Sequence, residues 1–195
     1  MKDVLNLPIL HGTLEEKIGS LISWIDEKVS RVQWSNDEID DVFGRRDIRQ
    51  ILSDGNTCYM NPCADLSLVA YAVMKKNNMS PVMIIDELAP GDYPFVRLHF
   101  GLEFSYDKND YFLDFIQLNR VLLGKGIFVN HKKDIKTLRT SKIACDISLD
   151  DNPMNIVLKE AKPKNFDLDS QLDRIKKDNT QINKQIRFHS NIAYQ

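Results

Sequence analysis

The sequence lacks most of the features that mark specialised classes of protein. Three cysteines in 195 residues are too few, and odd in number, for a disulfide framework, so we expect a reducing compartment. No apolar run approaches the ~20 residues of a membrane-spanning helix, and the N-terminus does not resemble a secretory signal. The eight glycines form no phosphate-binding loop, and a net charge of −2 provides no basic surface for nucleic acid. We therefore expect a soluble, cytoplasmic protein that binds neither membranes nor nucleic acid.

What is present is the composition of an ordinary globular protein of one domain. The apolar share of 43% can supply one well-buried core, and 195 residues are rather few for two. We assign residues 1–160 to a single domain with its core at about 46–150. Residues 161–195 form a separate, amphipathic helical segment.

The first third of the chain carries helix-start signals. Thr13 with Glu16, and Ser35 with Glu38, have the spacing of a capping box, in which hydroxyl and carboxylate satisfy free backbone N–H groups. A further short helix is expected from Asp47 to about Leu52, with Gly55 as its stop.

A longer helix is expected to begin at Asn61-Pro62 and to run to about Lys76. Asn is a favoured N-cap, and proline suits the first helical position because no N–H is required there. Apolar residues lie on nearly every side of this helix, so we expect it to be central and buried, with Cys63 in its first turn.

The remaining pattern is typical of strands. Alternation of apolar and polar residues is clearest over residues 95–105, and tyrosine, aspartate and asparagine supply a turn before the next strand. Five strands are expected, at residues 81–85, 95–105, 111–117, 126–129 and 142–147. Helices followed by an antiparallel sheet indicate an α+β fold.

Three residues could form a nucleophilic site. Cys63 would lie at a helix start, where the helix dipole and free N–H groups favour a thiolate and could stabilise an oxyanion. His99 lies on the non-core face of its strand, with Gly101 leaving room beside the ring, and Asp114 interrupts an apolar strand where a carboxylate needs a partner. An even loop, such as the four residues 106–109, puts His99 and Asp114 on one face, whereas an odd loop separates them.

The chain also resembles the transglutaminase-like (papain-like) cysteine enzymes. Gly55-Asn56-Thr57-Cys58, then Cys63 and its helix, then Ser80-Pro81-Val82 are similar to the family's cysteine, long helix and strand. His99 to Glu103 and Tyr111 to Asp114 are similar to its histidine and aspartate segments. The His-to-Asp spacing is also similar to that of arylamine N-acetyltransferases.

The resemblance implies a Cys63–His99–Asp114 triad that transfers acyl groups from a protein or peptide substrate. It implies no cofactor, unless acetyl-coenzyme A is used as in the acetyltransferases. Two departures matter: Phe115 follows Asp114 where the family has proline, and Cys58 also occupies a context that could mark the nucleophile.

Cys58 therefore remains an alternative nucleophile. If the helix began at Cys58, Pro62 would lie within the first hydrogen-bonded turn, where it removes a donor and clashes. This favours Cys63. We expect Cys145, in a short apolar run, to be structural.

The C-terminal segment carries a heptad seam with one asparagine in an apolar row. Its members are Leu168, Leu172, Ile175, Asn179, Ile182 and Ile186. The seam predicts either a helix docked on its own domain or self-association into a homo-oligomer. The second option carries the rival function, in which a catalytically inactive relative acts as a protein-binding or assembly module.

Overall fold

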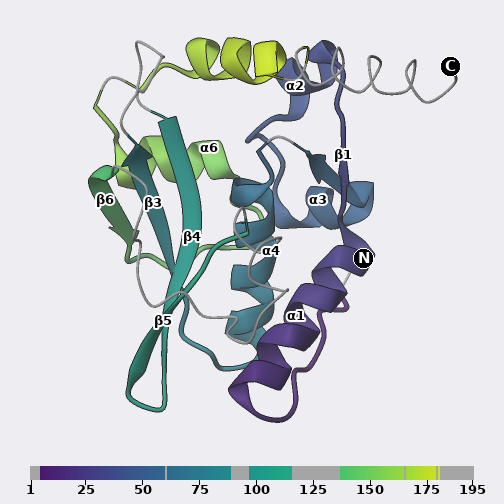
Figure 1. The fold of residues 1–195 in the computed structure, drawn as a ribbon, viewed down its shortest axis with the longest axis vertical. Coiled ribbons are helices and arrows are strands. Elements are labelled where there is room, and N and C mark those ends of the chain that lie inside the picture. The colour runs from purple at the N-terminus through teal and green to yellow at the C-terminus, as the bar shows by residue number, and fades with distance from the viewer. Residues whose placement is uncertain are drawn as a thin grey trace, which may run out of the picture.

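Helices build the first part of the chain and an antiparallel sheet follows, as Figure 1 shows. The computed structural model describes residues 5–59, 61–88, 97–115, 137–164, 166–178 and 180. Its helices are α1 (Leu14–Lys28), α2 (Asn36–Val42), α3 (Ile48–Asp54), α4 (Cys63–Lys76), α6 (Pro153–Ile156), the π-helix η1 (Val157–Ala161) and a further helix at 168–178. Its strands are β1 (Ser30–Val32), β2 (Asn56–Cys58), β3 (Val82–Leu88), β4 (Arg97–Tyr106), β5 (Asn109–Leu113) and β6 (Thr137–Ile143). The predicted α+β class is confirmed.

Capping chemistry sets the starts of the early helices. Both predicted capping boxes form, at Thr13 and Ser35, and a third forms at Asp47, whose side chain accepts from the Gln50 N–H. Gly55 ends α3 in the left-handed conformation at φ +65°, as the sequence indicates.

Helix α4 is the centre of the molecule. It contacts α1 and α3 as well as β3 and β4, and every residue from Cys63 to Met74 is buried. In Figure 1 it lies between the sheet and α1. The predicted start is displaced by one residue: Pro62, not Asn61, is the N-cap, and Cys63 is the first helical residue. Proline fits this position because the N-cap needs no N–H for the helix.

The main sheet has the strand order β5-β4-β3-β6, with every pair antiparallel. Tyr106 pairs with Asn109, so the connecting loop consists of Asp107 and Lys108 alone, both with positive φ as in a two-residue hairpin. The loop is shorter than the predicted four residues but is also even in number. His99 and Asp114 therefore lie on the same face of the sheet, as the triad requires.

Several predicted strand boundaries are wrong. The strand expected at 111–117 runs from Asn109 to Leu113, and the one expected at 142–147 is β6, from Thr137 to Ile143. Cys145 follows β6 and is exposed, so it is not the buried structural residue that its apolar neighbours suggested. The strand expected at 126–129 lies outside the described residues.

A small second core joins the C-terminal helix to the rest of the chain. Strands β1 and β2 pair in parallel, and beside them Trp34, Ile39, Cys58, Leu172 and Ile175 form a buried cluster. The described part of the heptad seam thus packs within its own chain. The helical segment expected from 161 is interrupted, because Lys162 ends η1 in the left-handed conformation and the next helix begins at 168. Asn179, Ile182 and Ile186 lie outside the described side chains.

Candidate active site

Cys63 lies where the dipole of α4 is positive. It is the first helical residue, no side-chain hydrogen bond caps the helix at Pro62, and the residue is only 4% exposed. The first N–H groups of a helix have no intrahelical acceptor, so those of this turn are available to a negative charge. The position suits both a thiolate and an oxyanion formed next to it.

His99 and Asp114 meet as the alternation of the strands predicts. His99 belongs to β4, and Asp114 directly follows β5, one residue beyond the pair Leu102–Leu113. The Nε2 atom of His99 lies 3.0 Å from Oδ2 of Asp114, and both residues are buried. With Nε2 on the carboxylate, the other ring nitrogen is left for a partner on the opposite side.

Cys63 is the second residue that acts on the imidazole. Burial alone lowers the pKa of His99, but hydrogen bonds with Asp114 and Cys63 and the negative charges of both outweigh it and raise the pKa to about 10. A raised pKa of this size means that the imidazole is protonated at neutral pH. The structure therefore brings the three predicted residues together: the carboxylate is hydrogen-bonded to the imidazole at 3.0 Å, and Cys63 lies close enough to raise the pKa of the same imidazole.

Cys58, the alternative nucleophile, lies elsewhere. It ends β2, where it pairs with Val32, and it is buried in the small second core with Trp34. The cysteine that helps to raise the pKa of His99 is Cys63. The preference for Cys63 that Pro62 gave in the sequence agrees with this geometry.

The sequence analysis missed a second buried carboxylate beside the imidazole. Asp86 of β3 pairs directly with His99 across the sheet, is 3% exposed, and accepts a hydrogen bond of 2.7 Å from the hydroxyl of Thr140. Cross-strand partners lie on the same face of the sheet. The signal in the sequence was an acid within the apolar run Val82–Leu88, the same kind of signal that drew attention to Asp114.

The role expected for Gly101 also needs correction. The glycine does not leave open space beside the imidazole, because a Cβ there would lie 2.4 Å from Cζ of Phe112. The ring of Phe112 thus covers the glycine backbone. Gly101 is needed for this close packing between β4 and β5.

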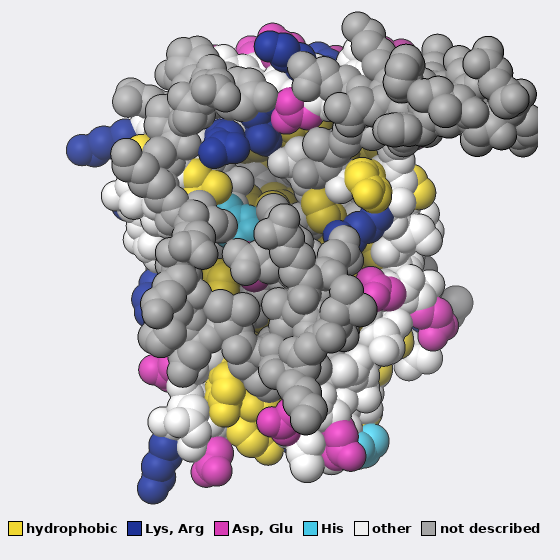
Figure 2. All heavy atoms as spheres, in the orientation of Figure 1, with side chains coloured by type: hydrophobic (Ala, Val, Ile, Leu, Met, Phe, Trp, Pro, Cys, Tyr) yellow, Lys and Arg dark blue, Asp and Glu magenta, His cyan; other side chains and the backbone are white. Residues whose placement is uncertain are grey.

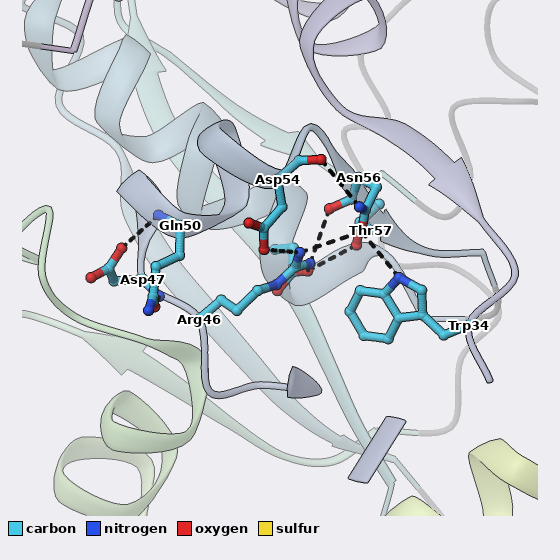
Figure 3. Close-up of polar contacts among 8 residues, drawn as sticks. Trp34, Arg46, Asp47, Gln50, Asp54, Asn56 and Thr57 are labelled. Atoms are coloured by element: carbon cyan, nitrogen blue, oxygen red, sulfur yellow. Dashed lines mark hydrogen bonds and ion pairs between the residues drawn. The ribbon is translucent and has the colours of Figure 1, made fainter. Parts of the chain in front are cut away.

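A buried polar cluster, also missed, fixes the chain just before and after Cys63 (Figure 3). Arg46 is 4% exposed and pairs with Asp65 of α4 at 2.7 Å and with Asp54 at 3.0 Å. Thr57 donates to the same Asp65 oxygen at 2.9 Å, and the Arg46 guanidinium lies 4.7 Å from the ring of Trp34. Burial raises the pKa of Asp65, while the charge and hydrogen bonds of Arg46 oppose that rise.

The cluster connects three segments. Asn56 of β2 accepts from the Trp34 indole at 3.0 Å through its side chain and from Arg46 at 3.0 Å through its carbonyl oxygen. Asp65 lies two residues after Cys63, in the same first turn of α4. The sequence does not predict the burial of these charged residues, since charged residues in short connecting segments are usually solvated.

A pocket opens at Cys63. Cys63 and Ala64 line it from α4, and Leu98 and Phe100 line it from β4. Its other walls come from the end of α2, from α6 and η1, and from the helix at 168–178, and the space including open solvent at its mouth is about 480 Å³. In Figure 2, hydrophobic side chains gather around a histidine in the upper half of the visible face.

Other types of site are not evident in the described part of the chain. Among these residues, no group of three or more His, Cys, Asp or Glu side chains could hold a metal ion. None of the described helices is long and apolar enough to cross a membrane. Comparison with known proteins gave no matching family model, no matching curated protein and no matching solved structure.

Proposed function

We propose that the chain is a cysteine-dependent acyl-transfer enzyme with a transglutaminase-like (papain-like) arrangement, in which Cys63 is the nucleophile, His99 the acid and base, and Asp114 the orienting carboxylate. The observation that carries the proposal is the buried His99–Asp114 hydrogen bond, with Cys63 beside the same imidazole at the uncapped start of a buried helix. A nucleophile, a base and a group that orients the base are the parts that such catalysis requires.

The chemistry follows from the order of the three groups. The Cys63 sulfur, having given its proton to His99, attacks the carbonyl carbon of an amide or ester, and the resulting oxyanion faces the free N–H groups of α4. When the carbon–nitrogen bond of an amide breaks, His99 returns the proton to the leaving amine, and a thioester remains on Cys63. Water or a second amine then attacks the thioester and gives a proton to His99. The carbon–sulfur bond breaks, the acid or new amide leaves, and the proton on His99 returns to the sulfur as the thiol.

Asp114 acts through position and charge. Its carboxylate accepts from Nε2 of His99 and so directs the other ring nitrogen toward the sulfur. The negative charge also stabilises the imidazolium that forms when Cys63 gives up its proton. Burial of all three residues strengthens these interactions, because little water competes for them.

The choice between hydrolysis and transfer depends on which nucleophile reaches the thioester. A peptidase or deamidase admits water, whereas a transglutaminase-like enzyme or an acyltransferase admits an amine. The triad chemistry is common to all of these, so we propose the reaction class and a protein, peptide or other amide-type acyl donor as substrate.

The proposal is tested by the pH dependence of iodoacetamide alkylation, with each modified cysteine located by peptide mass spectrometry. We expect Cys63 to be alkylated rapidly near neutral pH, and this reactivity to be lost in His99→Ala. Cys145 is the internal control. It is exposed, but partial desolvation of its thiol and the charge of nearby Glu160 raise its pKa, so it should be alkylated more slowly near neutral pH.

The other outcomes are equally specific. Rapid alkylation of Cys58 with Cys63 unreactive would transfer the nucleophile to Cys58 and contradict the triad as proposed. If neither residue reacts in the folded protein while both react in urea, the acyl-transfer proposal is wrong.

A further inference from the structure

The pocket beside Cys63 is lined by one of the three residues of the proposed site and not by the other two. Cys63 lines the pocket, whereas His99 and Asp114 do not, because they lie on the opposite face of β4 from the lining residues Leu98 and Phe100. Cys63 therefore borders the pocket and also acts on the imidazole of His99. A group attached to the carbonyl carbon that Cys63 attacks would extend into this pocket.

The walls of the pocket are largely apolar. Besides Leu98 and Phe100 they include Phe43 from the end of α2, Met154 from α6 and Val157 from η1. Asn61, Gln171 and Arg174 are the polar residues of the lining. Covering the apolar part of this surface with an apolar group releases water and is favourable, so the pocket favours an apolar group.

The helix at 168–178 forms one wall of the pocket. Leu168 and Ile175 line it, and they lie seven residues apart, on the same side of this helix. Ile175 is fully buried, whereas Leu168, at the start of the helix, is partly exposed. The apolar seam, which the sequence predicted either to dock on its own domain or to mediate self-association, thus builds a wall of the pocket in its described part.

Two polar contacts hold the helix in this place. Lys176 binds the carboxylate of Asp40 in α2 at 2.6 Å, and Arg174 donates to the side-chain oxygen of Asn61 at 3.0 Å. Asn61 itself lines the pocket and is two residues from Cys63. The C-terminal helix is therefore fastened directly to the segment that presents the nucleophile.

We propose that the pocket binds the acyl group of the substrate, that this acyl group is apolar, and that the helix at 168–178 together with Met154 sets its size. This inference rests on the proposed acyl-transfer function and adds the class of acyl donor to it. An apolar acyl chain seated here would place its carbonyl carbon at the Cys63 sulfur.

The test uses the full-length chain and p-nitrophenyl esters of acetate, butyrate, hexanoate and octanoate. The thiolate attacks the ester carbon, the carbon–oxygen bond breaks, and p-nitrophenolate leaves with the electron pair and is measured by its absorbance. The acyl group remains as a thioester on Cys63, which intact-mass spectrometry detects. We expect the acylation rate to rise up to about fourfold for each buried methylene until the pocket is full.

Two variants test which residues set the preferred length of the acyl chain. Met154→Ala enlarges the pocket and should move the optimum to longer chains, and Leu168→Trp fills it and should move the optimum to shorter ones. Leu158→Ala is the matched control, since Leu158 lies in the same helical segment but is 58% exposed and should leave the profile unchanged. Circular dichroism and urea unfolding check that each variant is folded. The wild-type profile alone tests the proposal if either variant does not fold.

The failure of this inference is distinguishable from failure of the proposed function. If iodoacetamide alkylates Cys63 rapidly but the acylation rate does not depend on chain length, the acyl pocket is wrong and the nucleophile stands. If Cys63 reacts with neither reagent, both proposals are wrong. If the profile changes equally in Leu158→Ala and Met154→Ala, the pocket does not set the size of the acyl group.

Discussion

The protonation of His99 should be visible in the pH dependence of stability. Hydrogen bonds to Asp114 and Cys63 overcome the effect of burial and raise its pKa from 6.5 to about 10. Taken alone, a raised pKa contributes stability that is fully present below about pH 6.5 and is lost as the pH rises toward 10, because the native state binds the extra proton. The loss would be about 1.4 kcal/mol per pH unit, or about 2.7 kcal/mol over two units.

The proposed mechanism alters this expectation, because it takes the proton of His99 from Cys63. Between about pH 6.5 and 8.5 the unfolded chain has a neutral imidazole and a thiol, so these two residues hold one proton. A native thiolate–imidazolium pair also holds one, and the stability it contributes should not change in this window. At lower pH the unfolded chain gains a proton and at higher pH it loses one, so the contribution falls by about 1.4 kcal/mol per unit on both sides.

The measurement is urea unfolding of wild type and His99→Gln at intervals between about pH 5 and about pH 10, followed by subtraction of the two free energies of unfolding. We expect the difference to form a plateau that falls on both the acid and the alkaline side. The same subtraction is then made between Cys63→Ser and the double variant Cys63→Ser/His99→Gln. In this pair the difference should no longer fall on the acid side, since His99 then takes its proton from solvent. A wild-type difference that falls continuously from about pH 6.5 would refute the thiolate–imidazolium pair.

Other substitutions act on the positioning of the site. Asp114→Asn removes the carboxylate that accepts from His99 at 3.0 Å, so alkylation of Cys63 near neutral pH should slow at least about tenfold, and an unchanged rate would exclude Asp114 from the site. Gly101→Ala introduces a Cβ 2.4 Å from Phe112, so urea unfolding should show a loss of about 1–3 kcal/mol that Phe112→Leu relieves, whereas additive losses would contradict the contact. Arg46→Met leaves the carboxylate of Asp65 buried without its cation, so the free energy of unfolding should fall by about 3–5 kcal/mol, and adding Asp65→Asn should recover part of it; no recovery would argue against this pair.

Local signals predicted the elements that position the proposed site. Capping boxes and Gly55 marked the early helices, and Pro62 marked the start of α4 to within one residue. The His99–Asp114 contact depended only on the parity of the hairpin loop and on strand alternation, both of which are local. Such features are readable because the physical cause lies within a few residues in the chain.

The features that were missed depend on residues far apart in the sequence. Strands β1 and β2 have three residues each and pair across 26 positions, so neither carries a periodic pattern. The pocket combines the end of α2 with a helix more than 120 residues later. A heptad seam fits docking and self-association equally well, because both bury the same apolar face. The packing of Leu172 and Ile175 shows docking for the described part of the seam.

The buried cluster around Arg46 holds in place the first turn of α4, which carries the proposed nucleophile. The first turn of α4 has no side-chain cap at Pro62, so the free N–H groups do not by themselves fix where the helix begins. Asp65 in that turn is instead held by Arg46 and Thr57, and Arg46 also binds Asp54. An ion pair buried in this way contributes little net stability, because the cost of desolvating its charges offsets their attraction. Its directional bonds do fix the first turn relative to the preceding strand, which leaves the uncapped N–H groups available for the proposed reaction at Cys63.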